Sequence, residues 1–185
     1  MVLKDKNILA EYKVASAIPS AAVIVSTCLM IFFYPYIVER LDSTYKEIKN
    51  YFIKLLITFV FINGVIFVIL ELSAPILLQI LYGDKYLNVL SIFRLLIFNF
   101  FLSSGIRKLL GNLIAITKNV HINLIHNIIA GILNIVLDLH LIIRFGAFGA
   151  AIATTICTLL MCIIESFYIV MFLRKKKITE KLNIR

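Results

Sequence analysis

The chain has 185 residues, of which 62% are hydrophobic and 16% charged, and its mean hydropathy is +1.01. Soluble domains are about half apolar and about a quarter charged, so this composition excludes an ordinary soluble domain and predicts an integral membrane protein with several spans. The formal net charge of +9 does not indicate a nucleic-acid partner. The basic residues cluster at the ends of apolar segments, where anionic lipid and topology account for them, and no groove-reading or single-strand-binding motif accompanies them.

Five apolar segments reach the roughly 17 to 25 residues that a membrane-spanning helix needs. They predict an all-α polytopic membrane protein formed by a single domain over residues 1–185. The apolar residues 73–82 are too few to span a bilayer and end at the turn Gly83–Asp84–Lys85, which favours a short segment at the membrane interface. The expected spans cover residues 14–38, 51–72, 90–117, 121–143 and 147–173.

The distribution of basic residues predicts the orientation of the chain. They concentrate in residues 40–54 and 107–118 and in the tail 174–185, and an excess of lysine and arginine is typical of cytoplasmic loops and tails. The carboxy terminus is therefore expected in the cytoplasm and, with five spans, the amino terminus on the opposite side. This orientation places Lys4, Lys6 and Lys13 on the non-cytoplasmic side, which is unusual for a complete protein, so we expect a fragment whose preceding helix is missing.

No arrangement typical of an enzyme's active site occurs in the sequence. There is no Ser-His-Asp arrangement, no His-Glu-x-x-His sequence and no glycine-rich phosphate loop, so we expect neither an enzyme nor a bound cofactor. Cys28, Cys157 and Cys162 show no metal-ligand or disulfide spacing. We interpret them as small core residues and expect no metal site.

A polar stripe runs along the fourth expected span. Its members are separated by four, four, three and four residues, and this spacing places them on one face of a helix. An unpaired amide or carboxylate is costly in hydrocarbon, so the stripe must face protein or a wet cavity. It consists of Asn123, Asn127, Gly131, Asn134 and Asp138.

Two charged residues lie at similar depth in the outer half of the expected bundle. Arg94 lies near the outer end of the third span and Asp138 near the outer end of the fourth. Charged groups at such depth pair with one another or line a water-filled path, so we expect Arg94 and Asp138 to interact. The pair either neutralises a helix contact, or rearranges and binds a charged substrate during transport. Asp138 is also a candidate for coupling to an ion.

A second charged group is expected on the cytoplasmic side. Arg107 and Lys108 are expected about ten residues from the cytoplasmic end of the third span, and Glu165 about nine residues from the cytoplasmic end of the fifth span, so the three share a depth. His126 lies near the same level in the fourth span. A cavity there would attract an anionic head group, because the arginine guanidinium can grip two phosphate oxygens. The alternative is that both cations extend to the interface. Glu165 and His126 are further candidates for ion coupling, although a histidine beside asparagines is also typical of a hydrogen-bonding core residue.

The last expected span begins with small residues at helical spacing. Gly149 and Ala153 have the small-x-x-x-small separation, which lets two helix backbones approach closely in lipid, where no hydrophobic force drives helices together. We expect this face to be a helix contact. A tight turn after Arg144 and Phe145 would hold the fourth and fifth spans antiparallel.

Several stretches of the sequence resemble one family. They are residues 134–154 (NIVLDLHLIIRFGAFGAAIAT), 9–19 (LAEYKVASAIP), 34–36 (YPY), 80–86 (ILYGDKY) and 92–96 (IFRLL). Together and in this order they resemble the lipid-linked polysaccharide flippases of the multidrug, oligosaccharidyl-lipid and polysaccharide exporter superfamily, and they favour the O-antigen flippase type. Such flippases have two six-helix lobes around a central cavity. Five spans correspond to the carboxy-terminal lobe of this twelve-helix arrangement without its first helix.

The resemblance implies a function and partners. It implies part of a flippase that moves an undecaprenyl-diphosphate-linked oligosaccharide, the O-antigen repeat unit of lipopolysaccharide, across the cytoplasmic (inner) membrane by alternating access. Besides this substrate and membrane lipids, the expected partners are a missing amino-terminal lobe or other polysaccharide-assembly proteins. The residues expected to line the cavity are Arg94, Arg107, Lys108, Asn134 and Asp138, together with Asn123 and Asn127.

Two alternatives stay open. A cation-coupled small-molecule exporter of the same superfamily would share the fold and need an essential titratable carboxylate, for which Asp138 is the candidate. A truncated, non-transporting membrane subunit would only pack against partners, and the missing first lobe is the feature that points to it.

Overall fold

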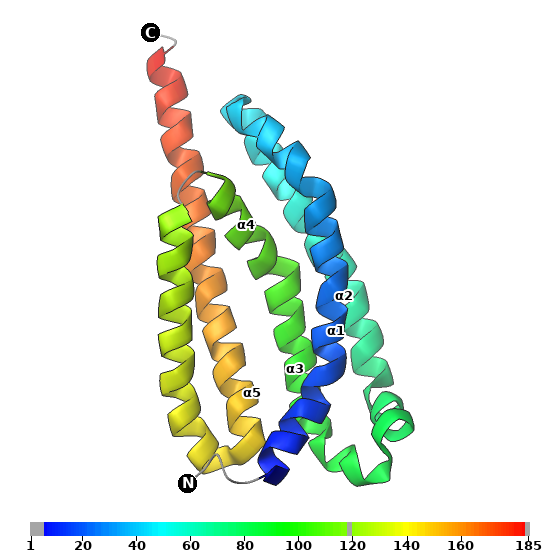
Figure 1. Ribbon diagram of the computed structural model, residues 1–185. Helices are drawn as coiled ribbons and strands as arrows, with labels where there is room; N and C mark the ends of the chain where they lie inside the picture. Colours follow the sequence, from blue (N-terminus) through cyan, green and yellow to red (C-terminus); the bar gives the residue numbers. More distant parts are fainter. Residues whose placement is uncertain (1–5, 118–119, 184–185) are drawn as a thin grey trace.

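The computed structural model describes residues 6–117 and 120–183 and is all-helical over these residues, without a strand (Figure 1). The all-α prediction is therefore confirmed for the described chain. Its elements in chain order are α1 (Lys6–Glu39), η2 (Arg40–Asp42), α2 (Tyr45–Tyr82), η3 (Asp84–Val89), α3 (Leu90–Leu102), the π-helix η4 (Ser103–Arg107), α4 (Lys108–Ile116) and α5 (Val120–Asn183).

Helices long and apolar enough to cross a membrane make up most of the described chain, which is compatible with a multi-pass membrane protein. The last of them folds back at Gly146, where φ is 58° and ψ is −135°. Figure 1 shows α5 as two antiparallel segments, which we call the first limb (120–145) and the second limb (147–183). Among the described residues, four such helices occur: Ile8–Asp42, Tyr45–Tyr82, Asp84–Ile116 and His121–Leu182.

Residues 73–82 do not form the separate short segment expected from the sequence but continue α2, which has 38 residues. Pro75 lies inside α2, yet Ala74 and Leu78 beside it are fully buried in a core shared with η3 and α3. This packing holds the helix together across the hydrogen bond that proline removes. At about 1.5 Å per residue α2 is about 57 Å long, well beyond the roughly 30 Å of a hydrocarbon core. Part of α2 must therefore tilt or extend outside the apolar layer.

The third helix, formed by η3, α3, η4 and α4, lies between the α1–α2 pair and α5 (Figure 1). Two apolar cores stabilise this arrangement. One lies toward the end where α1 meets α2, which we call the Leu41 end, and the other toward the Gly146 end. Between the two cores the buried residues include polar ones, and this polar layer contains the candidate site.

The two limbs of α5 contact each other closely near Gly146. A Cβ placed on Gly149 would lie 2.2 Å from the carbonyl oxygen of Leu141, so only glycine fits there. Farther from the turn, the Cys157 thiol donates to the carbonyl oxygen of Ala130 at 3.2 Å. The small-residue face therefore packs one limb against the other, as its spacing indicates.

The three cysteines differ in burial. Cys157 and Cys162 are buried, as expected of small core residues, whereas Cys28 is exposed. The interpretation as a core residue is wrong for Cys28. Ser26 and Met30 form the packed face of α1 at this level, and Cys28, two residues from each, lies on the other side of the helix.

The end of α5 is bound to the turn between α1 and α2. The Nζ of Lys176 donates to the carbonyl oxygen of Leu41, and the backbone N–H of Tyr45 donates to the Glu180 Oε2 at 2.9 Å. Lys177 lies over the ring of Tyr45, with its Nζ 5.6 Å from the ring centroid. These contacts connect the last helix with the first two at the Leu41 end.

We expect Gly149→Ala to lower the free energy of unfolding in detergent by about 1–3 kcal/mol, the usual cost of overpacking. The added methyl group would push the limbs apart at a backbone atom that has no room to move. Thermal unfolding followed by circular dichroism measures the effect. Gly131→Ala is the matched control, because nothing lies within 4 Å of a Cβ at Gly131 and alanine favours helix over glycine. Equal melting temperatures for Gly149→Ala and the unmodified protein would contradict the close limb contact.

Candidate functional site

Polar side chains are buried between the two apolar cores. Ser26 of α1 donates to the Oδ1 of Asn63 of α2 at 2.6 Å, and the Nδ2 of Asn63 donates to the carbonyl oxygen of Phe59 at 2.8 Å. Ser26 and Asn63 are fully buried. A polar group shielded from solvent is costly unless it is hydrogen-bonded, so these bonds satisfy both side chains and connect α1 with α2.

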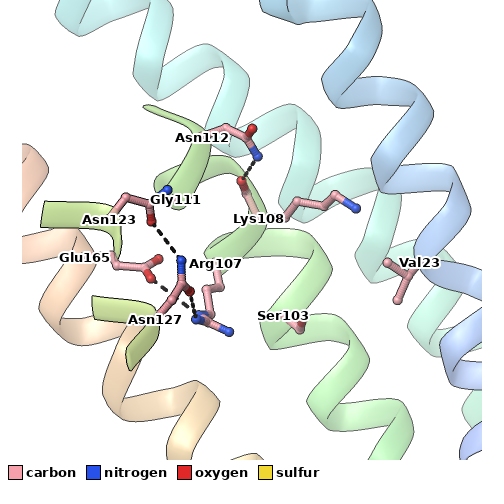
Figure 2. Close-up of a pocket in the computed structure, with 9 residues that line it drawn as sticks. All are labelled: Val23, Ser103, Arg107, Lys108, Gly111, Asn112, Asn123, Asn127 and Glu165. Carbon is pink, nitrogen blue, oxygen red and sulfur yellow. Dashed lines mark hydrogen bonds and ion pairs between the residues drawn. The ribbon is translucent and has the colours of Figure 1, made fainter. Parts of the chain in front are cut away.

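The π-helix η4 interrupts the third helix in this polar layer. A π-helix contains one extra residue in a turn, which rotates the side chains that follow it. Gly105 of η4 lies against α2, and a Cβ on Gly105 would be in ordinary van der Waals contact with the Cβ of Asn63, at 3.5 Å. Arg107 and Lys108, at the junction of η4 and α4, point to opposite sides, toward α5 and toward α1 (Figure 2).

A cavity of about 310 Å³ lies between α1, the third helix and both limbs of α5 (Figure 2). Most of the residues around it are polar, in contrast to the apolar cores on either side. We call it the Arg107 cavity. It is lined by Val23, Ser103, Arg107, Lys108, Gly111, Asn112, Asn123, Asn127 and Glu165.

Two side chains of α5 contact the Arg107 guanidinium at the cavity wall, and a third supports one of them (Figure 2). Its Nη2 donates to the Asn127 Oδ1 at 3.0 Å, and its Nε lies 3.4 Å from the Glu165 Oε1. Asn127 Nδ2 in turn donates to the Asn123 Oδ1 at 3.4 Å. A guanidinium has five N–H donors, and the Arg107 side chain is 28% exposed. Donors of Arg107 are therefore available to a ligand.

Glu165 is the buried member of this network. It is 1% exposed, and its Oε2 has no hydrogen-bond partner among the described residues. A Cβ on Gly111 would lie 3.9 Å from that oxygen and equally far from the Asn123 Oδ1, so the missing side chain of Gly111 leaves room beside both. Arg107 thus compensates the buried carboxylate through one of its two oxygens.

Lys108 faces the opposite wall. Its Nζ donates to the Oγ1 of Thr27 on α1, and its carbonyl oxygen accepts a hydrogen bond of 2.7 Å from the Nδ2 of Asn112. The partner of the Lys108 ammonium is a neutral hydroxyl, so its charge is not balanced there. Among the described residues that line the cavity, Glu165 is the only acidic one against two cations, which gives this lining a net positive charge.

A second cavity, of about 210 Å³, adjoins the first along α1. The two share the lining residues Val23 and Ser103. The Oδ1 of Asn99 on its wall is buried without a hydrogen-bond partner among the described residues. Polar groups thus continue from the Arg107 cavity toward the Gly146 end. This second cavity is lined by Tyr12, Ser16, Pro19, Ser20, Val23, Leu96, Asn99, Phe100, Ser103 and Thr154.

The structure divides the residues expected at the site. The polar stripe of the first limb does not form one continuous wall, since Asn134 and Asp138 line neither of these cavities. Asp138 follows Asn123 by fifteen residues, which turns an α-helix about 60° past four full turns, so the two ends of the stripe are rotated with respect to each other. The Oδ1 of Asp138 is buried without a hydrogen-bond partner in the described chain. Of the residues expected at the site, the Arg107 cavity brings together Arg107, Lys108, Asn123, Asn127 and Glu165.

His126 lies outside the Arg107 cavity. Its ring packs edge-to-face on the ring of Tyr168, with 6.3 Å between centroids. This contact joins the two limbs of α5. The expected hydrogen bonding is not seen at the buried Nδ1 of His126, which has no hydrogen-bond partner among the described residues.

Arg94 does not pair with Asp138, and this expectation was wrong. Its Nε lies 3.1 Å from the Oε1 of Glu71, and both side chains are partly exposed, at 50% and 32%. The pair joins α2 to α3, which are connected through η3. In two antiparallel helices, residues that lie equally far before and after the connection are at the same height, and Glu71 and Arg94 are such a pair. That symmetry was visible in the sequence, where Glu71 precedes the Gly83 turn by about as much as Arg94 follows it.

Sequence reasoning missed several residues of the site. Asn112 could have been found, because it lies four residues after Lys108 and therefore on the same helix face. Thr27 and Val23 come from α1, and no pattern in the sequence connects them with Arg107 or Lys108. Only the packing of α1 against the third helix reveals them.

The arrangement can bind an anion, because two cations line one polar cavity and amide groups beside them can donate or accept hydrogen bonds. Comparison of the chain with known protein families, with curated proteins and with solved structures finds no match.

We expect Arg107→Ala to destabilise the protein by about 2 kcal/mol, somewhat below the cost for a fully buried pair because Arg107 is partly exposed. The substitution leaves the Glu165 carboxylate buried without its cation. Arg107→Ala combined with Glu165→Gln removes that charge and should regain most of the loss. Chemical denaturation in detergent measures all three proteins. A double variant no more stable than Arg107→Ala would contradict the pairing.

Proposed function

We propose that this chain is part of a membrane transporter in which the Arg107 cavity holds the anionic head group of a lipid-linked oligosaccharide, as in the flippases that the sequence resembles. One observation carries the proposal: two consecutive cations of the third helix line a polar cavity inside a bundle of apolar helices. A diphosphate offers oxygens to both cations. The neighbouring asparagine amides suit the hydroxyl groups of a sugar.

The charge balance of the cavity supports an anionic substrate. Glu165 compensates Arg107 in part, whereas the partner of the Lys108 ammonium within the described chain is the neutral Thr27 hydroxyl. A diphosphate entering the cavity would neutralise Lys108 and use the free donors of Arg107. The undecaprenyl chain would remain in the lipid, so only the polar part of the substrate has to pass through the protein.

The adjoining cavity along α1 supports a transport path. Its polar residues on α1, Tyr12, Ser16 and Ser20, are spaced by four and lie on one helix face. They continue the polar surface from the Arg107 cavity toward the opposite end of the bundle. Two linked polar cavities are what a head group needs to cross an apolar layer without leaving polar surroundings.

We further infer that the chain crosses the cytoplasmic membrane five times, with each limb of α5 counting as one span. The turn between α1 and α2 and the basic tail of α5 lie together at the Leu41 end, which supports a cytoplasmic location for that end. The Arg107 cavity would then lie nearer the cytoplasm, where the lipid-linked substrate would enter.

Alternating access requires a second helical unit that moves against the one described. In the family that the sequence resembles, the amino-terminal lobe is that unit. We propose that such a lobe, or another polysaccharide-assembly protein, faces α1 and the Arg107 cavity and completes the binding site.

We expect Arg107→Lys to weaken the binding of undecaprenyl diphosphate about tenfold or more, because lysine keeps the charge but loses the paired donors. Native mass spectrometry of the protein in detergent measures the affinity. Arg94→Lys is the matched control, since Arg94 pairs with Glu71 away from the cavity and its replacement should leave the affinity unchanged.

Complementation of a flippase-deficient strain should rank the same variants in the same order. An Arg107→Lys protein that binds and complements as well as the unmodified chain would refute the phosphate-clamp role of Arg107.

A cation-coupled exporter is a second candidate, supported by two buried carboxylate oxygens without hydrogen-bond partners in the described chain, the Asp138 Oδ1 and the Glu165 Oε2. For this function we expect Asp138→Asn to abolish the dependence of dye efflux on a sodium or proton gradient. Everted membrane vesicles measure it. Asn134→Ala, one helical turn away, serves as the control. Gradient-dependent efflux that survives in Asp138→Asn would remove Asp138 from this role.

A further inference from the structure

A third cavity lies outside the Arg107 site, on the second limb of α5 near the Leu41 end. Its volume is about 560 Å³, and it shares no lining residue with the Arg107 cavity. In Figure 1 the second limb runs past the start of the first limb toward the carboxy terminus, and the cavity lies where the two limbs part. It is lined by Ile122, Tyr168, Met171, Phe172, Lys175, Lys176 and Thr179.

The lining residues of the second limb form one helix face that changes character along its length. They are spaced by three, one, three, one and three residues, as one face of an α-helix requires. The face is apolar through Met171 and Phe172 and basic from Lys175 onward. Ile122 of the first limb adds to the apolar half. A ligand that fits this cavity has an apolar part and an anionic part, arranged along the helix axis.

The positive charge of this cavity is not compensated within the described chain. No ion pair there involves Lys175 or Lys176. The nearest acidic side chain on the same helix, Glu180, lies one helical turn after Lys176 and accepts a hydrogen bond from the Tyr45 backbone N–H. Arg174 and Lys177 flank the two lysines and raise the local positive potential.

We infer that this cavity is a binding site for an anionic phospholipid. The phosphate contacts the ammonium groups of Lys175 and Lys176 and the hydroxyl of Thr179, and an acyl chain lies along Ile122, Met171 and Phe172. Long cationic side chains next to apolar ones are suited to the boundary between head group and hydrocarbon. The inference goes beyond the proposed transport function and does not depend on it, since it concerns a separate cavity and a bilayer lipid.

Native mass spectrometry of lipids retained by the protein tests the inference. The protein is reconstituted in mixtures of phosphatidylcholine and phosphatidylglycerol and then transferred to detergent. We expect preferential retention of phosphatidylglycerol. Lys175→Gln should reduce it about fivefold, the factor that corresponds to the attraction of one cation to an anionic lipid surface. Lys176 is left intact because it also binds the Leu41 carbonyl oxygen.

Matched variants separate this site from general surface charge. Lys177→Gln removes the same charge two residues away, outside the cavity lining, and should change retention less than twofold. Equal losses for Lys175→Gln and Lys177→Gln would show a diffuse basic surface and overturn the site. In the apolar half, Met171→Ala should reduce retention while Val170→Ala, exposed but outside the lining, should not. Equal effects of these two variants would also overturn it.

A competition experiment identifies the source of the phosphate group. Glycerol phosphate has the head group without the acyl chains, and at millimolar concentration it should leave phosphatidylglycerol retention unchanged. Displacement by glycerol phosphate would show a site for soluble phosphate esters and overturn the lipid assignment. Equal retention of phosphatidylcholine and phosphatidylglycerol would show that charge plays no part and would overturn it as well.

Discussion

Glu165 lies opposite Asn123 and Asn127 because the two limbs of α5 run antiparallel in direct contact, and this contact depends on the reversal at Gly146. The positive φ of Gly146 turns the chain, and the absent side chain of Gly149 lets one limb reach the backbone of the other. In lipid, where hydrophobic association does not drive helices together, such close packing is a main source of cohesion. The network that holds Arg107 is therefore built on two glycines well away from it.

The third helix supplies the other half of the site, and its π-helix decides where the cations point. In one regular α-helix over residues 90–116, the side chains of Arg107 and Lys108 would point in the directions set by the 3.6-residue repeat of α3. The extra residue in η4 rotates them with respect to α3, so that α3 packs in one apolar core and α4 in the other while the cations lie between. The π-helical turn thus lets the third helix pack in both apolar cores and still direct Arg107 and Lys108 to the polar cavity between them.

Much of the fold could be predicted from the sequence, because apolar segment length and small-residue spacing depend on local physics. The reversal between residues 143 and 147 and the pairing of its limbs are of this kind. The continuation of α2 through Pro75 could not be predicted, since it depends on burial of Ala74 and Leu78 against distant residues. For the site, shared depth correctly predicted that Arg107, Lys108 and Glu165 lie together. Depth alone gave the wrong partner for Arg94, although the similar distances of Glu71 and Arg94 from the Gly83 turn would have indicated the right one.

The contacts that bind the end of α5 to the turn between α1 and α2 have a consequence for sequence variation. Lys176 binds the carbonyl oxygen of Leu41, and Glu180 accepts from the backbone N–H of Tyr45. Both side chains bind the main chain, so neither bond depends on the side chain at position 41 or 45, and only proline at position 45, which has no N–H, would remove one of them. These two bonds would therefore survive most substitutions in that turn while its backbone path persists, and selection on them would act on the length of the turn and on the two tail residues.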